Sequence, residues 1–461
     1  MSEIKKRIII RSTKALSILV SVGLFCLCWN FYYGAWIGAG RSVGYLIATG
    51  ILYMVLTVLM GRIYGAYETG SFRISQLVYS QGLSVCWCAL IAYVVISLLR
   101  FRLANPLPLL VMVVVQLAWS ILWSFLTNKL YFAIYAPKAT VVLYASEGDS
   151  RKLEEIKHFD RKFKVTRYIK VCRETPLQLH ELEGAEAVFV TVLDMELRNT
   201  VAKYCMNHGA ECYIQPRVGD VIMSGAKHAQ MFSVPIVCVH KAEPNPEYLI
   251  FKRLFDIFAS FIAIILASPF MAVTALAIKL QDGGPVLYKQ KRLTRNRREF
   301  FVLKFRSMRV DAERDGVARL STENDDRITP VGKLIRKIRF DELPQLFNIL
   351  KGDMTIVGPR PERPEIAEQY EKEIPSFGLR LQVKAGLTGY AQIYGRYNTE
   401  PYDKLKMDLM YINNMSVTED LRLMFATVKV LFQAESTEGI EEGQITASHV
   451  EEEKEKTTVG V

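Results

Sequence analysis

The first 140 residues are mostly apolar stretches separated by short polar segments. Each stretch is close to the roughly 20 residues that a helix needs to cross the hydrocarbon core of a bilayer. The stretches run from residues 14 to 37, 44 to 61, 77 to 99 and 107 to 127. The pattern predicts four N-terminal transmembrane helices. The second is short and glycine-containing, which leaves a buried amphipathic helix as its alternative.

The charges that flank these stretches predict their orientation. Basic residues gather before the first stretch, after the second and after the fourth, and cytoplasmic loops carry such an excess. The first run is longer than a signal-peptide core and no small-residue cleavage site follows it, so it is expected to remain as an anchor. The N-terminus and everything after residue 130 are therefore expected to be cytoplasmic, in a multi-pass membrane protein.

From Ala139 onward the pattern changes to short β-rich runs alternating with charged helical stretches. This alternation predicts a small Rossmann-like α/β domain with a parallel sheet. The turn after the first strand, Leu143 to Asp149, has one glycine and two acids, whereas a dinucleotide site needs bare backbone beside the phosphates. A structural or regulatory role is expected for this domain, which also offers a surface for a homodimer. The strands are expected at 140–144, 164–171, 187–192 and 211–215.

A fifth apolar run, residues 254 to 280, differs from the first four because it contains Ser268-Pro269 at its centre. Proline inside a helix removes one hydrogen bond and bends the axis. Both flanks of the run are basic, which a spanning helix would have to place on opposite faces of the membrane. A re-entrant helix that keeps both flanks in the cytoplasm is the favoured interpretation, and an ordinary fifth span is the alternative.

These patterns divide the chain into four parts. The expected parts are a four-helix transmembrane domain (1–135), the α/β accessory domain (136–245), an α/β domain with a re-entrant helix (246–433) and a disordered acidic tail (434–461).

Composition restricts the chemistry that the chain can perform. Half of the residues are hydrophobic and the net charge is +11, which fits a membrane face or phosphorylated substrates. The eight cysteines include no CxxC pair, which argues against a disulfide framework or a zinc site. No histidine or cysteine lies between Lys241 and Ser448. A nucleophile or base in that region must be a carboxylate, a hydroxyl or a lysine.

The best local candidate is the pair Asp341-Glu342. Pro330 suits the start of a helix and Pro344 the first turn of another, so a break is expected near Phe340. Asp341 would then lie at a helix N-terminus, where unpaired backbone N–H groups attract anions. A plain N-cap is the alternative role.

Basic residues gather around this pair in the sequence. Lys304 and Arg306 alternate along an expected short strand, and Arg336 precedes the pair closely. Arg360 lies between two prolines, which would aim its guanidinium. Forked arginine donors together with a lysine suit a diphosphate.

Seven ordered blocks resemble the bacterial sugar transferase family, and in particular its long-form polyprenyl-phosphate glycosyl-1-phosphate transferases. The resemblance covers about residues 250 to 433. The blocks are Lys252 to Asp256, Ser268-Pro269, Lys304 to Met308, Asp341 to Leu346, Gly352 to Met354, Val357 to Pro361 and Gly386 to Gly389.

The resemblance implies transfer of a sugar 1-phosphate, with a hexose as the expected sugar, from a UDP-sugar to undecaprenyl phosphate in a membrane, with release of UMP. It implies Asp341 as the nucleophile, Glu342 as its partner carboxylate, and Mg²⁺ on Asp341. It further implies phosphate, nucleotide or sugar contacts from Lys304, Arg306, Arg336, Arg360, Gln392 and Arg396, and a membrane-helix anchor and bend at Lys252, Arg253, Asp256, Ser268 and Pro269.

Two other readings remain open from the sequence. One is a catalytically idle scaffold or regulator of polysaccharide assembly, although the intact Asp341-Glu342 pair counts against it. The other is a polytopic transferase that works by direct displacement, which would need more spanning helices. No nucleic-acid partner is expected.

Overall fold

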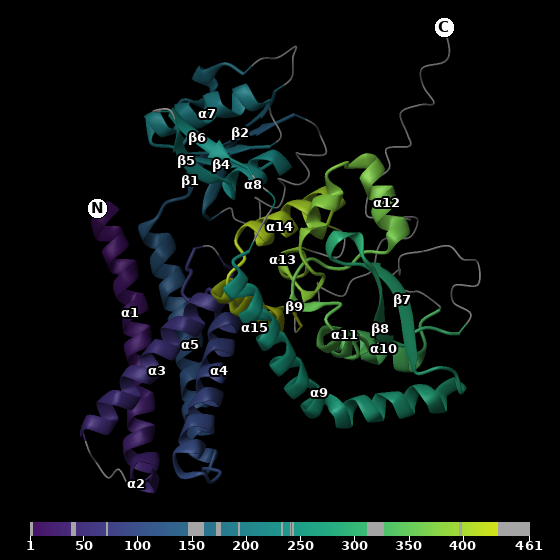
Figure 1. Ribbon diagram of the computed structural model, residues 1–461. Coiled ribbons are helices and arrows are strands. Elements are labelled where there is room, and N and C mark those ends of the chain that lie inside the picture. Colours follow the sequence, from purple (N-terminus) through teal and green to yellow (C-terminus); the bar gives the residue numbers. More distant parts are fainter. Residues whose placement is uncertain are drawn as a thin grey trace. The chain divides into compact units, whose positions relative to one another are not determined.

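The structure is a computed structural model that describes residues 3–37, 43–70, 72–145, 161–171, 177–191, 194–231, 234–239, 241, 244–310, 327–395 and 399–431. It divides into two compact units, Met1–Pro216 and Arg217–Val461 (Figure 1). The predicted acidic tail and the glycine-poor turn beyond Ala145 lie outside the described residues.

Long apolar helices form the N-terminal part of the first unit, as predicted. Neighbouring helices pack in the pairs α1 with α3, α1 with α5, α3 with α4, and α4 with α5. Among the described residues, five helices are long and apolar enough to cross a membrane, and the fifth belongs to the second unit. The elements are α1 (Glu3–Cys28), continued by the π-helical turn η1 (Trp29–Tyr33) and α2 (Gly34–Ile37), then α3 (Val43–Tyr64), α4 (Ile74–Arg100) and α5 (Leu107–Ile134).

Hydrogen bonds between buried polar groups join three of these helices. The Tyr53 hydroxyl donates to Gln116 Oε1 at 3.0 Å, and Gln116 Nε2 donates to the Ser21 carbonyl oxygen at 2.8 Å. An unsatisfied polar group in hydrocarbon costs several kcal/mol, so such bonds are needed between spanning helices. The outer surface of α3 is apolar, with Ile51 and Val55 both more than half exposed. This exposure suits contact with lipid rather than a buried amphipathic helix.

The predicted parallel sheet is confirmed in the same unit. Its strands lie in the order β2-β1-β3-β4, and every neighbouring pair is parallel. Val141, Leu143, Val188 and Val190 form its core with Val201 of helix α7. The bounds are β1 (Lys138–Tyr144), β2 (Phe163–Lys170), β3 (Ala187–Val190), α7 (Met195–His208) and β4 (Glu211–Ile214).

The second unit contains three two-stranded sheets enclosed by short helices. Its elements are α8 (Val218–Ser224), β5 (Lys227–Met231), β6 (Val234–Cys238), α9 (Pro246–Asp282), β7 (Leu287–Leu293), η4 (Arg295–Arg297), β8 (Glu299–Phe305), α10 (Pro330–Lys337), η5 (Phe340–Glu342), α11 (Gln345–Lys351), β9 (Thr355–Val357), α12 (Pro364–Glu373), η6 (Phe377–Gln382), β10 (Gly386–Thr388), α13 (Tyr390–Ile393), α14 (Pro401–Asn413) and α15 (Val417–Leu431).

Helix α8 packs against α14 within the second unit. Val218 and Val221 share a buried cluster with Leu405 and Leu409 of α14. Asn413 Nδ2 also donates to the Val221 carbonyl oxygen at 2.6 Å. The buried apolar face of α8 therefore packs on α14. The alternation of strands and helices along the sequence does not indicate this contact.

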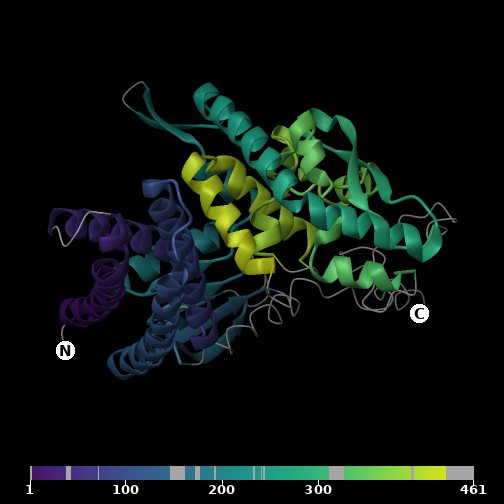
Figure 2. The same cartoon turned by 90° about the horizontal axis from the view of Figure 1, so that it is seen from below.

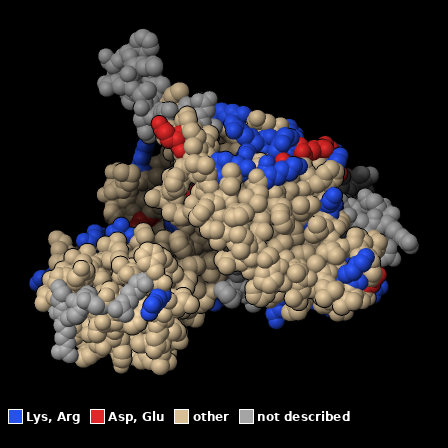
Figure 3. All heavy atoms as spheres, turned by 60° about the horizontal axis from the view of Figure 1, so that its bottom comes forward, with Lys and Arg blue, Asp and Glu red and all other residues tan. Residues whose placement is uncertain are grey.

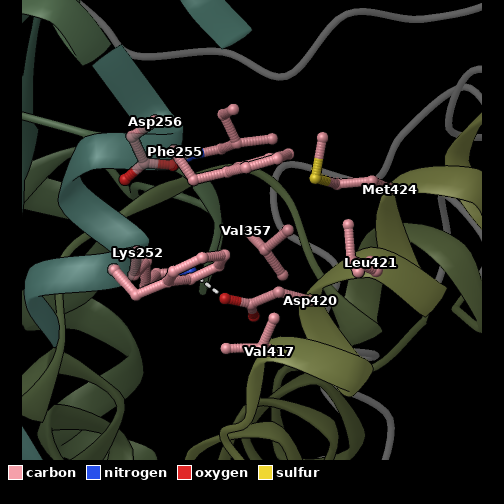
Figure 4. Close-up of a pocket in the computed structure, with 10 residues that line it drawn as sticks. Lys252, Phe255, Asp256, Val357, Val417, Asp420, Leu421 and Met424 are labelled. Atoms are coloured by element: carbon pink, nitrogen blue, oxygen red, sulfur yellow. Dashed lines mark hydrogen bonds and ion pairs between the residues drawn. The ribbon is translucent and has the colours of Figure 1, made fainter. Parts of the chain in front are cut away.

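The long apolar helix α9 is held by the second unit at its N-terminal half. Lys252 forms an ion pair of 2.6 Å with Asp420 of α15, and the Tyr248 hydroxyl donates to the same carboxylate at 2.8 Å (Figure 4). Figure 4 shows this ion pair beside a small cavity of about 20 Å³ lined by Phe255, Val357 and Met424 among others. The first half of α9 is therefore fixed on α15 and β9.

Two further anchors hold the same half of α9. Arg253 donates to the carbonyl oxygens of Ile349 and Leu350 at the end of α11, both at 2.7 Å. Asp256 accepts hydrogen bonds from the Thr355 hydroxyl at 2.7 Å and the Ile356 backbone N–H at 3.1 Å. Lys252, Arg253 and Asp256 therefore join the first half of α9 to α15, α11 and β9.

The second half of α9 returns to the same unit. Asp282, its last residue, pairs with Arg306, and the Phe270 ring packs edge-on against Phe340 with centroids 6.2 Å apart. Pro269 lies inside the helix, and Figure 1 shows the helix axis turning between the two halves. The Ser268 hydroxyl donates to the Ile265 carbonyl oxygen at 2.8 Å, one of the adjustments that accompany bends.

The opposite side of α9 is an apolar surface. Figure 3 views the second unit from the side on which the helix lies, and few charged side chains appear there. The exposed fraction of Leu266 is 69% and that of Leu280 is 77%, values unusual for leucine in a water-soluble fold. The exposed apolar side chains are Leu254, Phe258, Phe261, Ile265, Leu266, Phe270, Val273, Leu276 and Leu280.

Candidate active site

The Asp341-Glu342 pair lies in a short turn between two helices. Thr329 caps α10, its hydroxyl accepting from the Gly332 backbone N–H at 3.0 Å, and α10 ends at Lys337. Arg339 then adopts a left-handed conformation with φ of 55°, a strained geometry that starts the 3-10 turn η5. The predicted break near Phe340 is confirmed.

The structure corrects the expected position of Asp341. Helix α11 begins at Gln345 with Pro344 as its N-cap residue, so Asp341 neither caps it nor lies at its N-terminus. Asp341 lies instead within η5, whose neighbours Phe340 and Leu343 pack into the apolar cluster around Ile278 of α9. An apolar residue on each side of the acidic pair therefore holds the turn against α9.

Glu342 is engaged by two cations. Its Oε1 lies 2.9 Å from Lys304 Nζ and 3.1 Å from Arg360 Nη2. Burial opposes ionisation of Glu342, but the charges of Lys304 and Arg360 outweigh it and hold the pKa of Glu342 far below its usual range. Burial also lowers the pKa of Lys304, a shift that the Glu342 charge opposes. The ionised Glu342 therefore connects Lys304 of β8 with Arg360, which lies in the segment between β9 and α12 (the Arg360 loop).

Asp341 is buried, with 9% of its surface exposed, but its carboxylate is not engaged. No hydrogen bond or ion pair joins it to another residue in the part of the chain that the structure describes. Burial raises the pKa of Asp341, the Lys304 charge opposes the rise, and the Glu342 charge adds to it. An unengaged carboxylate beside fixed cations is the arrangement expected of a nucleophile or a metal ligand.

Arg336 supplies a further donor beside Asp341. Its charge lowers the pKa of Asp341, although less than burial raises it. Its Nη1 is buried and has no hydrogen-bond partner among the described residues. A buried donor without a partner is costly, so this nitrogen is well suited to a phosphate oxygen.

The other predicted contact residues are distributed unevenly. Arg306 is buried and committed to Asp282, away from the acidic pair. Gln392 donates to the Leu387 carbonyl oxygen at 3.1 Å, and its own amide oxygen is buried without a partner among the described residues. Arg396 lies outside the described residues. The structure therefore brings together Lys304, Arg336 and Arg360 around Asp341-Glu342.

The side chains around Asp341 could supply only part of a Mg²⁺ coordination sphere. Among the described residues, no group of three or more His, Cys, Asp or Glu side chains could hold a metal ion. Glu342 Oε1 already contacts two cations, whereas the Asp341 carboxylate has no ion pair among the described residues. Mg²⁺ is commonly bound through one or two carboxylates together with substrate phosphates and water. The site fits an ion that arrives with a diphosphate.

Sequence reasoning missed a set of buried charges behind Arg360. Arg380 and Asp408 are 2% and 1% exposed, and they form an ion pair of 2.6 Å. The signal was present in α14, where Asp408 lies among the buried residues Leu405, Leu409 and Ile412. An acid on an apolar stripe requires a buried partner.

Known proteins resemble the C-terminal part of this chain. The sequence model of the family described as bacterial sugar transferase matches residues 247–434. A UDP-N-acetylgalactosamine-undecaprenyl-phosphate N-acetylgalactosaminephosphotransferase of Aeromonas hydrophila is 44% identical over 191 residues, covering 41% of this chain and 45% of that protein. A UDP-glucose:undecaprenyl-phosphate glucose-1-phosphate transferase of Escherichia coli is 40% identical over 219 residues, covering 46% of this chain and 47% of that protein.

A shorter relative covers the catalytic part alone. The exopolysaccharide production protein PSS of Rhizobium leguminosarum is 42% identical over 189 residues, which are 39% of this chain and 94% of that protein. The chain spans about half the length of the longer curated relatives it matches. The similarity to the shorter relative covers nearly its whole length and includes the Asp341-Glu342 site, and the chain therefore belongs to the bacterial sugar transferase family.

Proposed function

We propose that this protein transfers a sugar 1-phosphate from a UDP-sugar to undecaprenyl phosphate and releases UMP. The observation that carries the proposal is the unengaged, buried carboxylate of Asp341 beside the Lys304–Glu342–Arg360 cluster. The relatives named for this reaction differ in their sugar, which is glucose or N-acetylgalactosamine. A hexose 1-phosphate is the proposed group, in the first membrane step of exopolysaccharide, capsule or O-antigen synthesis.

The proposed reaction has two displacements at phosphorus. An Asp341 carboxylate oxygen attacks the β-phosphorus of the UDP-sugar, and the bond from that phosphorus to the bridging oxygen breaks. UMP leaves with the bonding electron pair, and the sugar phosphate is held on Asp341. A phosphate oxygen of undecaprenyl phosphate then attacks the same phosphorus, which restores the carboxylate and forms the lipid diphosphate sugar.

The surrounding residues assist by placing charge. Arg336 Nη1, which lacks a partner in the described structure, would donate to a phosphate oxygen next to Asp341. Lys304 and Arg360 keep Glu342 ionised, and all three then present fixed charges that need no rearrangement during the reaction. Mg²⁺ held by Asp341 and the diphosphate would neutralise charge that develops on the leaving UMP.

The proposed membrane arrangement follows from α9. Its first half is bound through Lys252 and Arg253 and its last residue through Asp282, all to the same unit. A helix tied at both ends to one globular unit keeps both ends on one side of a membrane. The exposed apolar side of α9 would then enter one leaflet, with the catalytic unit on the cytoplasmic face and four helices of the first unit spanning the bilayer.

Labelling of single cysteines tests this topology. In a variant whose native cysteines are replaced, Glu247→Cys and Lys289→Cys place thiols on exposed positions just inside the N-terminus of α9 and just beyond its C-terminus. Both should react with a membrane-impermeant maleimide only from the cytoplasmic side of oriented vesicles. Leu103→Cys, between α4 and α5, is the control and should react only from the opposite side. Reaction of the two α9 thiols from opposite sides would show a spanning helix.

Release of UMP tests the proposed reaction. The detergent-solubilised protein should release UMP from one UDP-sugar of a panel, and turnover should require both undecaprenyl phosphate and Mg²⁺. Without the lipid, release should stop at one UMP per protein, because Asp341 is then occupied. A folded protein that releases no UMP from any member of a panel including N-acetylated and modified sugars would overturn the proposal and favour a scaffold.

A further inference from the structure

The Arg360 loop is fixed from behind by charged residues that are too deeply buried to touch a substrate. Arg380 Nη2 donates to the backbone carbonyl oxygen of Arg360 at 2.9 Å, and the same nitrogen lies 2.6 Å from Asp408 Oδ2. Arg380 Nη1 lies 3.5 Å from Glu362 Oε1. The Arg380 guanidinium also stacks on Phe377, 4.9 Å from the ring centroid.

Arg292 holds the other end of the same loop. Its Nη1 donates to the Pro361 carbonyl oxygen at 3.0 Å, and it pairs with Glu362 Oε2 at 3.7 Å. The loop backbone is fixed further by the Leu293 N–H, which donates to the Glu362 carbonyl oxygen at 3.0 Å. The buried Arg380 and the partly buried Arg292 therefore bind consecutive parts of the segment that carries Arg360.

Asp408 completes this arrangement from a helix far along the chain. Asp408 is 1% exposed, and the positive charge of Arg380 compensates the negative charge of its buried carboxylate. Breaking a buried ion pair leaves one uncompensated charge in a low-dielectric environment, which is strongly unfavourable. Burial raises the pKa of Asp408 to about 6, and the Arg380 charge limits the rise. The Arg380 charge therefore favours the ionised form of the Asp408 carboxylate.

We propose that Arg380 and Asp408 are positioning residues, which fix the backbone of Arg360 so that its guanidinium stays on Glu342 beside Asp341. The expected effect on UMP release rests on the proposed function. The fixed position of the Arg360 backbone does not. The Arg360 side chain is 42% exposed, whereas its backbone carbonyl oxygen accepts from the buried Arg380. Arg380 thus holds the backbone carbonyl of Arg360 and not the Arg360 side chain.

A double-mutant cycle tests this role. Asp408→Asn should lower kcat for UMP release about tenfold and change the KM for the UDP-sugar little, because the defect concerns the charges beside the reacting phosphorus. In an Arg360→Ala background, Asp408→Asn should have almost no further effect, since residues that act as a unit are not additive. Losses that simply multiply would overturn the proposal.

Asp403→Asn is the matched control. Asp403 also lies on α14 and also has a cationic partner, Lys406 at 2.6 Å, but neither residue contacts the Arg360 loop among the contacts of the described chain. It should retain full activity. If Asp408→Asn does not fold, Arg380→Lys replaces it, because lysine keeps the charge but has no second nitrogen to contact Glu362 while the first contacts Asp408 and the Arg360 carbonyl oxygen.

Hydrogen exchange separates this inference from the proposed reaction. In Asp408→Asn, a peptide covering residues 355–363 should exchange faster, whereas a β7–β8 peptide should not change. If the wild-type protein released no UMP but this segment still loosened, the proposed function would fail and the positioning role would stand. Unchanged exchange in the segment would overturn the positioning role whatever the activity.

Discussion

Asp341→Asn is expected to abolish UMP release and the covalent phosphosugar on the protein, with a loss of at least about 10³-fold in kcat. The amide has nearly the same size and cannot supply a carboxylate oxygen to phosphorus. The fold should survive, because no described residue depends on Asp341 for an ion pair. Burial of the charged carboxylate is unfavourable, so the variant should unfold at an equal or higher temperature than the wild type.

Two measurements check this result. Intact-protein mass after incubation with the UDP-sugar, without the lipid, should show an added sugar phosphate in the wild type and none in Asp341→Asn. Asp403→Asn, an aspartate of α14 outside the site, should behave as the wild type in both assays. An Asp341→Asn variant that still turns over robustly would exclude Asp341 as the nucleophile.

Glu342→Gln is expected to lower kcat/KM about 100-fold and to move the acid limb of its pH profile to lower pH. The negative charge of Glu342 raises the pKa of Asp341, and it also neutralises Lys304 and Arg360, whose charges lower that pKa. Removing the charge therefore lowers the pKa of Asp341 on both counts. The reactive carboxylate should stay ionised at lower pH than in the wild type, where burial raises its pKa.

A full pH profile of kcat/KM for each protein gives the direct comparison. Glu371→Gln serves as the control, since Glu371 is also paired with an arginine, Arg297, but lies on α12. Its profile should coincide with that of the wild type. An acid limb that moves to higher pH in Glu342→Gln would contradict the assignment of that limb to Asp341.

The elements of the fold were largely readable from the sequence. The apolar runs and the β-rich runs have distinctive periods, and the bend of α9 is encoded in one proline at residue 269. The packing of α8 on α14 could not be predicted from the sequence. Helix α8 is only seven residues long, and it contacts α14 through side chains from distant parts of the chain.

The site was predictable only as far as its motifs. Asp341, Glu342, Lys304 and Arg360 are adjacent to recognisable blocks, and the structure brings them together. Arg306 shows the limit, since two residues beyond Lys304 it lies at the end of β8 and pairs with Asp282 instead.

Arg380 and Asp408 belong to none of those blocks. Their role depends on a contact with one backbone carbonyl, that of Arg360, which no sequence pattern displays.

The anchor between Lys252 and Asp420 sets an order for biosynthesis. The two residues are separated by 168 positions, so the ion pair cannot form until translation has passed α15. Until then α9 has been synthesised, but its Lys252 ammonium lacks the Asp420 carboxylate as a counterion. A chain that ends before Val417 would therefore leave the Lys252 ammonium without this counterion. Synthesis of α15 is thus required before this contact of α9 can form.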